Sequence, residues 1–229
     1  MLNLIIRKLI ISLLLATNLS FASAADPYER YNRKIFSFNE RLDSFLFKPA
    51  ARFYNFITPG FIDKGITNIF SNLSEPKNVV NNALQLNYLD SSISFFRLIT
   101  NSTFGFGGFF DVCSYFGFES KSEDFGQTLS LWGIEGGPYI VLPVIGGRYL
   151  RDSFSIFPDN YLSLTKRINH PSTRYSTKLI EVIDIRSDLI DAEKLISGDR
   201  YIFIRDIYFQ TRLNDINANS TLNDFDSDF

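Results

Sequence analysis

Few side chains in this sequence of 229 residues are suited to chemistry. There is one histidine, His170, and one cysteine, Cys113. A zinc site needs several such ligands and an intramolecular disulfide needs a pair of cysteines, so the composition excludes both within the chain. Cys113 lies in an apolar run, where a small buried residue is its expected role. We predict no metal and no cofactor.

Catalytic patterns are also missing. No G-x-S-x-G elbow occurs, and Gly105-Phe106-Gly107-Gly108 does not match the dinucleotide pattern G-x-G-x-x-G because position 110 is Phe. A Ser-His-Asp triad would need His170, which stands at an expected helix start. Glu119 and Glu123 could pair as acid and base, but a solvated charged loop explains them better. We therefore predict that the protein is not an enzyme.

The most unusual segment is 101–152, which holds most of the 13 glycines and the single tryptophan, Trp132, among many phenylalanines. Glycine costs about 1 kcal/mol per helical position relative to alanine, so this density predicts special backbone angles or close packing. We expect a shaped apolar surface or a passage here, with helices arranged around it.

The composition sets wider limits. The length allows one domain with a sizeable core, and the net charge of -2 does not indicate nucleic-acid binding. Aromatic residues make up 16% of the chain, with 24 Phe and 11 Tyr. These rings either form a Phe-rich core or face lipid, and composition leaves both interpretations open.

The N-terminal residues 1–24 are typical of a signal peptide. Arg7 and Lys8 precede the apolar run Leu9–Leu15, and Ala22-Ser23-Ala24 offers a cleavage site. We expect export, with an uncleaved anchor as the alternative. No cysteine lies near the cleavage site, so lipid attachment there is not expected. A helical domain is predicted over 25–216 and a disordered polar tail over 217–229.

The rest of the chain is predicted to be mainly α-helical. Asp26 is expected to cap a first helix that stops before Pro49, and Ser74-Glu75-Pro76 is expected to end a second one over 61–73. The later expected segments are helices from 76 to 86, from Asp90, over 109–116, after the Asp124–Gln127 capping pattern, over 171–196 and over 199–216, with 139–144 extended.

The helix from 76 to 86 carries an unusual set of amides. They are either a polar face in water or a polar strip that lines a wet passage. The amide residues are Asn78, Asn81, Asn82 and Gln85.

Membrane association is left open by the sequence. The longest uncharged run after the N-terminal segment is 98–110, shorter than the roughly 20 residues of a spanning helix. Short amphipathic helices with Phe-rich faces could lie within one leaflet or pack on each other.

The chain resembles the VacJ/MlaA family in a series of ordered motifs. The series begins with D-P-x-E-x-x-N-R at 26–33, F-x-F-N at 36–39, E-P at 75–76, Asn81 and L-Q at 84–85. R-x-x-x-N-S-T-x-G-x-G-G-x-x-D follows at 97–111. Shorter matches are F-G-Q-T-L at 125–129, W-G at 132–133, G-P-Y at 137–139, L-P at 142–143 and R-D at 151–152. The resemblance covers about 26–152 and extends weakly to 208–210.

The resemblance implies a single ring-like body of amphipathic helices around a central amphipathic channel, seated at the periplasmic side of the cell outer membrane. Such proteins remove misplaced phospholipid from the outer leaflet and pass it to a soluble MlaC-like carrier, often beside a trimeric porin. The implied partners are thus phospholipid, the outer-membrane bilayer, that carrier and a porin, and no nucleic acid.

Roles for residues follow from this resemblance and from the needs of a lipid, whose head group requires a polar path and whose tails require apolar walls. The amides Asn78, Asn81, Asn82 and Gln85 and the rings Phe104 and Phe106 are predicted to line the lipid channel. Gly105, Gly107 and Gly108 are predicted to form a hinge. Phe38 and Asn39 match a family position near the gate.

Three departures separate the chain from the family pattern: it has no lipobox cysteine, and Gly146-Gly147-Arg148 and Leu84-Gln85-Leu86 replace family motifs. The missing cysteine favours an alternative, a soluble periplasmic lipid-binding module. A hydrolase that uses His170 is the third hypothesis.

Overall fold

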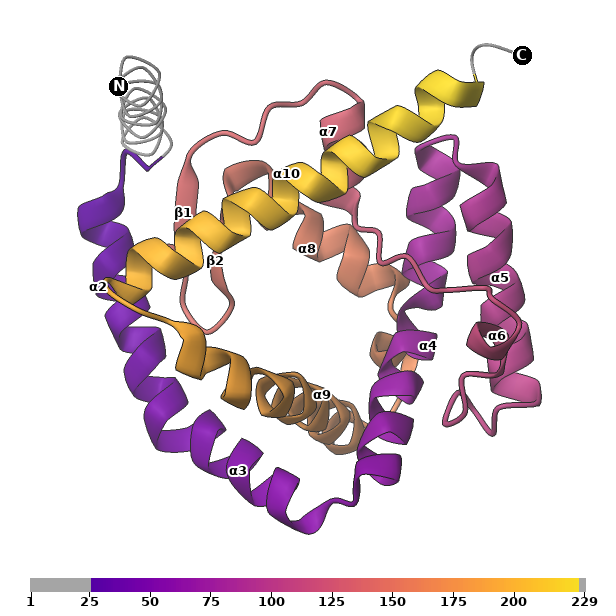
Figure 1. The fold of residues 1–229 in the computed structure, drawn as a ribbon, viewed down its shortest axis with the longest axis horizontal. Coiled ribbons are helices and arrows are strands. Elements are labelled where there is room, and N and C mark those ends of the chain that lie inside the picture. The colour runs from indigo at the N-terminus through magenta and orange to yellow at the C-terminus, as the bar shows by residue number, and fades with distance from the viewer. Residues whose placement is uncertain (1–25, 227–229) are drawn as a thin grey trace, which may run out of the picture.

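Helices follow one another around a ring in the computed structural model, which describes residues 26–226 (Figure 1). In that view α10 crosses one side, α9 is seen nearly end-on inside the outline, and α5 and α6 lie on the outer side of α4. The predicted mainly helical, ring-like fold is confirmed, whereas the signal-peptide prediction for 1–24 lies outside the described residues. The main helices are α2 (Glu29–Leu42), α3 (Lys48–Ile57), α4 (Gly60–Leu84), α5 (Tyr88–Thr103), α6 (Val112–Tyr115), α7 (Phe125–Leu131), α8 (Leu150–Leu162), α9 (Pro171–Ala192) and α10 (Arg200–Asp226).

A π-helical segment, Asp43–Phe47, joins α2 to α3 without a break. The prediction of a stop before Pro49 is therefore wrong. Proline lacks an N–H and crowds the preceding turn, but Pro49 lies in the first turn of α3, directly after the π turn. The wider π turn just before it changes the hydrogen-bond register, so the chain stays helical from Glu29 to Ile57.

The helix α4 is also continuous, and the predicted break at Ser74-Glu75-Pro76 does not occur. A proline inside a helix costs about 3 kcal/mol relative to alanine. α4 packs along α5, and buried side chains lie on both sides of Pro76, at Asn72, Glu75 and Asn78. Tertiary packing thus outweighs the local penalty of Pro76.

The glycine-rich region contains one β-hairpin. β1 (Tyr139–Leu142) pairs antiparallel with β2 (Gly146–Tyr149), with Tyr139 opposite Tyr149 and Leu142 opposite Gly146. The extended segment predicted at 139–144 is confirmed over 139–142, whereas 143–145 form the hairpin turn. The partner strand β2 was not predicted. Tyr139 and Val141 form the centre of a small apolar cluster with Tyr201 of α10.

Two amide side chains on α2 dock this helix against the hairpin. Asn32 donates from Nδ2 to a backbone carbonyl of β1 at 3.0 Å and accepts a backbone N–H at 2.9 Å. Asn39, two helical turns later, makes the same pair of bonds at 3.0 and 2.8 Å. Each amide therefore imitates the edge of a neighbouring strand. The four backbone partners are Tyr139, Val141, Leu142 and Val144.

The capping box predicted at Asp124–Gln127 is confirmed at the start of α7. The Gln127 backbone N–H donates to Asp124 Oδ1 at 2.8 Å, and the Asp124 N–H donates to Gln127 Oε1 at 2.7 Å. These reciprocal bonds satisfy backbone donors that the first turn leaves free.

The cap predicted for Asp26 is wrong. α2 begins at Glu29 with no side-chain cap. The buried Asp26 carboxylate instead accepts hydrogen bonds from Asn32 Nδ2 at 2.8 Å and from the Tyr201 hydroxyl. Distant partners thus replace the local N–H groups, because α10 packs over the start of α2.

The C-terminal helices differ from their predicted bounds. α9 ends at Ala192, and the short 3-10 turn Glu193–Leu195 follows it, so the predicted end at 196 is one residue too late. α10 runs to Asp226, so the predicted end at 216 is too early and 217–226 is helical rather than part of an irregular tail. A helix that is already nucleated adds residues at small cost, even polar ones.

Burial is inverted among the residues that the structure describes. Buried polar and charged side chains far outnumber the buried hydrophobic ones. Large apolar side chains lie outside, and Phe45 and Phe56 are each 87% exposed. The buried hydrophobic residues are Ala51, Cys113, Tyr139, Val141 and Tyr201.

This distribution differs from that of a soluble domain, whose interior collects aliphatic and aromatic side chains. Exposed apolar area of this extent marks an interaction surface. Within 26–226, no helix is both long enough and apolar enough to cross a membrane.

Candidate functional site

One guanidinium joins α4, α5 and α6 at a buried corner. Arg97, only 2% exposed, donates from Nε to Glu75 at 2.8 Å and from Nη2 to Asp111 at 3.0 Å. It also donates to Ser114 and to the carbonyl of Phe118. Burial acts to lower the pKa of Arg97, but the two carboxylates outweigh it and raise that pKa. Burial acts to raise the pKa of Asp111, but Ser114 and Arg97 outweigh it and lower that pKa.

The glycine turn, residues 104–110, starts at this corner and holds the predicted hinge. The N–H groups of Gly107 and Gly108 donate to carbonyls in the last turn of α5 at 3.1 and 2.9 Å, with φ of +72° and +96°. A Cβ on Gly105 would lie 2.2 Å from a backbone carbonyl, and one on Gly108 would lie 2.6 Å from Asn72 Cβ. Gly107 faces open space. The three glycines form one tightly bonded helix cap, and their hinge role stays a prediction.

Aromatic rings project outward from the glycine turn. Phe104 is 72% exposed and Phe106 is 81% exposed. The ring of Phe106 meets that of Phe110 edge-on at 6.1 Å between centroids. Two of the predicted channel residues, Phe104 and Phe106, therefore belong to the apolar exterior in this structure.

The four predicted channel amides occupy a different place. All are buried, with Asn81 and Asn82 fully covered. Their partners come from the 119–124 loop, α7 and α8, since Gln85 donates to Glu123 and Thr128 at 3.1 Å each and Asn81 donates to Asp159 at 3.2 Å. Thr128 donates back to Asn81 at 3.0 Å.

Asn78 and Asn82 complete this amide network. Asn78 donates to Glu75 at 3.0 Å and accepts the Glu123 backbone N–H at 3.1 Å. Asn82 donates to the carbonyl of Asn78 at 3.0 Å. Asn78, Asn81 and Gln85 thus hold α4 to its neighbours, whereas Asn82 bonds within α4. The structure does not bring these amides together with Phe104 and Phe106. Their role as a channel lining stays a prediction.

The two predicted gate residues, Phe38 and Asn39, have different surroundings. The Asn39 amide is held by the backbone at the end of the hairpin. The ring of Phe38 is half exposed and lines a shallow hollow of about 360 Å³ with Arg33, Lys34 and Arg41. A gating role for the pair stays a prediction.

A cationic pocket that sequence reasoning missed lies between α8, the following turn and α9. Its volume is about 310 Å³. The exposed rings of Phe157 and Tyr175 form apolar walls next to three cations. A phosphate needs positive charge and a tail needs an apolar wall, and this pocket offers both. The lining residues are Ile156, Phe157, Asn160, Thr165, Lys166, Arg174, Tyr175 and Lys178.

Two of these three cations are available to bind an anionic ligand. Lys178 pairs with Glu181 at 2.9 Å, whereas Lys166 and Arg174 form no ion pair in the part of the chain that the structure describes. Arg174 and Lys178 stand four apart, which puts them on one face of α9. The i, i+4 pair Arg174 and Lys178, together with Lys166 in the preceding turn, is the sequence signal that could have predicted this pocket.

The histidine of the hydrolase hypothesis is exposed. His170 Nδ1 lies 2.7 Å from Ser172 Oγ, and no carboxylate contacts the ring among residues 26–226. The pair lacks the third group that would orient the imidazole.

The ring of helices, its polar interior and its apolar exterior define a helical protein whose surface is suited to lipid. Comparison with known proteins identifies the family. The model of the MlaA lipoprotein family matches residues 24–215, and the chain belongs to this family.

Relatives and one solved structure agree with this assignment. The Escherichia coli (strain K12) intermembrane phospholipid transport system lipoprotein MlaA is 32% identical over 192 residues, which cover 81% of this chain and 76% of that protein. An uncharacterized Rickettsia prowazekii protein is 44% identical over 136 residues, 59% of this chain but only 54% of the relative, about half its length. A solved structure from work on the structural basis for maintenance of bacterial outer membrane lipid asymmetry matches with TM-score 0.75 and 31% identity, covering 84% of this chain and 99% of the other.

Proposed function

We propose that this protein is an outer-membrane component of intermembrane phospholipid transport. It removes misplaced phospholipid from the outer leaflet and passes it to a periplasmic carrier, which maintains lipid asymmetry. The observation that carries the proposal is the inverted burial: among the described residues, polar and charged side chains are buried between the helices, and many phenylalanines are exposed.

The apolar exterior supports a position within a leaflet. Transfer of apolar surface out of water is favourable by about 25 cal/mol per Å². Exposed rings on α3 and in the glycine turn, among them Phe53, Phe56 and Phe104, would gain this energy from acyl chains. A helical body can be held in this way without a spanning segment.

The cationic pocket supports a route for the head group. Moving a phosphate through an apolar body without a partner costs several kcal/mol, and Lys166 and Arg174 offer charge to offset it. The exposed Phe104 and Phe106 serve the tails. The buried amides of α4 reach a passing lipid only if α7 and the 119–124 loop move away from them.

Movement and partners complete the proposal. Gly105, Gly107 and Gly108 act as the hinge, and Phe38 with Asn39 acts as the gate. The protein lies at the periplasmic side of the outer membrane, delivers lipid to a soluble carrier similar to MlaC, and lies beside a trimeric porin. The family assignment and the polar interior support these statements.

The test is complementation of a Gram-negative strain that lacks its own MlaA. The wild-type chain should reduce the outer-leaflet phospholipid that added phospholipase can reach, and a Lys166→Glu, Arg174→Glu double variant should not. A Lys194→Glu variant is the control, because Lys194 is an exposed partner of Asp191 far from the pocket lining. Full complementation by the double variant would contradict the head-group route.

Fractionation separates the proposal from the soluble lipid-binding alternative. We expect the protein with the outer membrane after a high-salt wash, because apolar contacts do not weaken with salt. Release of all the protein by salt alone would favour the soluble module.

A further inference from the structure

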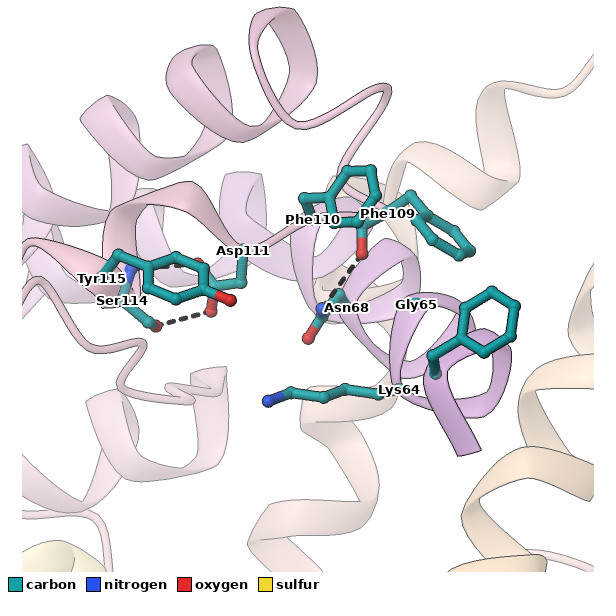
Figure 2. Close-up of a pocket in the computed structure, with 9 residues that line it drawn as sticks. Lys64, Gly65, Asn68, Phe109, Phe110, Asp111, Ser114 and Tyr115 are labelled. Carbon is teal, nitrogen blue, oxygen red and sulfur yellow. Dashed lines mark hydrogen bonds between the residues drawn. The ribbon is translucent and has the colours of Figure 1, made fainter. Parts of the chain in front are cut away.

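A second pocket lies on the outer side of α4, between its first turns and the α6 region (Figure 2). Its volume is about 460 Å³, within the range of about 300–1,000 Å³ of small-molecule sites. Figure 1 shows α5 and α6 on the side of α4 that faces away from the ring interior. This pocket is therefore separate from the cationic pocket at α8 and α9. Its lining is Phe61, Lys64, Gly65, Asn68, Phe109, Phe110, Asp111, Ser114 and Tyr115.

The wall of this pocket is built by a close approach between α4 and the glycine turn. A Cβ on Gly65 would lie 2.2 Å from the Phe109 ring, so only glycine lets that ring lie against α4. Asn68 Nδ2 donates to the Phe109 carbonyl at 3.1 Å and fixes the turn there (Figure 2). The wall is thus formed before any ligand arrives.

The pocket contains one cation and one carboxylate, and only the cation is available to bind a ligand. Lys64 is exposed and forms no ion pair in the described range 26–226. The Asp111 carboxylate already accepts bonds from Arg97, Asn101 and Ser114, at 2.6 to 3.3 Å. An incoming ligand therefore meets one free cation, and the carboxylate beside it is compensated.

The apolar part of the pocket continues into the exterior of the molecule. Phe61 is 71% exposed, Phe110 is 51% exposed and Tyr115 is 88% exposed. In Figure 2 the Lys64 amine extends along the pocket on the side of Ser114 and Tyr115. A ligand that satisfies this arrangement has one anionic group and a long apolar part.

We propose that this outer pocket binds a glycerophospholipid of the surrounding leaflet, with its phosphodiester on Lys64 Nζ and an acyl chain along Phe61 and Phe110. The occupant is a lipid held at the flank of the ring and is not the lipid in transit. Free phosphate would use Lys64 but would leave the aromatic wall in water. The proposal rests on the proposed seating in a bilayer.

The experiment uses photocrosslinking on the full chain in vesicles of phosphatidylethanolamine and phosphatidylglycerol. p-Benzoylphenylalanine replaces Phe61 as the probe, or Phe45 as the control on another exposed face. Adducts are measured by mass spectrometry for wild-type, Lys64→Gln and Lys64→Arg backgrounds. Inorganic phosphate in excess forms a further arm.

We expect a phospholipid adduct at Phe61 that falls about fivefold with Lys64→Gln, the upper effect of an exposed ion pair, and is retained with Lys64→Arg. The adduct at Phe45 should not change. If the Lys64→Gln background gives the same adduct yield at Phe61 as the wild-type background, the proposal is wrong. Loss of the adduct on addition of inorganic phosphate would also overturn it.

Failure of the proposed function gives a different result. If the protein lies outside the bilayer, neither Phe61 nor Phe45 yields an adduct. If Lys64→Gln lowers the Phe61 adduct while lipid transfer continues at the wild-type rate, the flank pocket stands as a site separate from transport.

Discussion

Two regions of this protein bury carboxylates, and they differ in the groups that compensate the negative charge. At the α4–α5–α6 corner, Glu75 and Asp111 face the guanidinium of Arg97. On α9, Asp184 is 2% exposed and forms no ion pair among the described residues. Its oxygens accept only hydroxyl bonds, from Tyr54 at 3.0 Å and Thr67 at 3.1 Å.

The presence or absence of a neighbouring guanidinium decides the direction in which the pKa of a buried carboxylate shifts. Burial raises the pKa of Asp184, and Asp188 and Asp63 add to the rise, against the hydroxyls of Tyr54 and Thr67. Near Arg212 the balance reverses: burial acts to raise the pKa of Asp124, but the guanidinium outweighs it and lowers that pKa. A polar interior thus holds both a charge-compensated part and a part that favours the protonated acid.

The largest expected effect is at the compensated corner. Arg97→Met leaves the fully buried Glu75 carboxylate without its cation, and should reduce the free energy of unfolding by about 3–5 kcal/mol. Denaturant unfolding in detergent, followed by circular dichroism, measures this loss.

A double variant tests the reason for that loss. Arg97→Met with Glu75→Gln removes the buried ion pair and should recover a large part of the stability, since Asp111 keeps its hydrogen bonds from Asn101 and Ser114. If the double variant is as unstable as the sum of the single ones, charge compensation does not explain the corner.

The glycine turn attached to this corner gives the next effect. Gly108→Ala should destabilise by about 2–3 kcal/mol, because φ is +96° and the new Cβ would meet Asn72 at 2.6 Å. Gly107→Ala is the matched control, with φ of +72° but open space, and should cost about 1 kcal/mol. Equal losses in thermal unfolding would show that crowding at Asn72 is unimportant.

Asp124, which is paired with Arg212, and Asp184, which is paired with no cation among the described residues, should respond to pH with opposite signs. The lowered pKa of Asp124 contributes stability above the ordinary carboxyl value of 3.8, and this is lost as pH falls through the folded value. Asp124→Asn should therefore cost about 1–2 kcal/mol at neutral pH and less in acid.

For Asp184 the folded state binds the proton more tightly, so stability falls as pH rises from 3.8 through the raised value. Asp184→Asn should remove this fall. Unfolding curves across the acid range compare the two variants, and parallel pH profiles for Asp124→Asn and Asp184→Asn would refute the contrast.

The smallest expected effect on stability is that of replacing an exposed aromatic ring. Phe104→Ser should change the free energy of unfolding by less than about 0.5 kcal/mol, since the ring is 72% exposed, yet it should lower the vesicle-bound fraction in flotation. Phe36→Ser is the control, because that ring packs edge-on against Tyr201 at 5.4 Å and its loss should destabilise the fold. Unchanged flotation of Phe104→Ser would count against lipid contact at the glycine turn.

The sequence by itself determined the local features. Apolar spacing gave the helical class, the Asp124–Gln127 pattern gave the start of α7, and the ordered motifs gave the family. These signals depend on residues a few positions apart, so no distant contact is needed to interpret them.

Only the tertiary structure decided which local rules were overruled. Pro49 and Pro76 do not break their helices, because a π turn absorbs the first and packing against α5 offsets the second. The α4 amides are covered by partners far along the chain, such as Thr128 for Asn81. Whether a polar side chain lines a passage or closes a buried network depends on what packs against it, and that is set by the assembled ring.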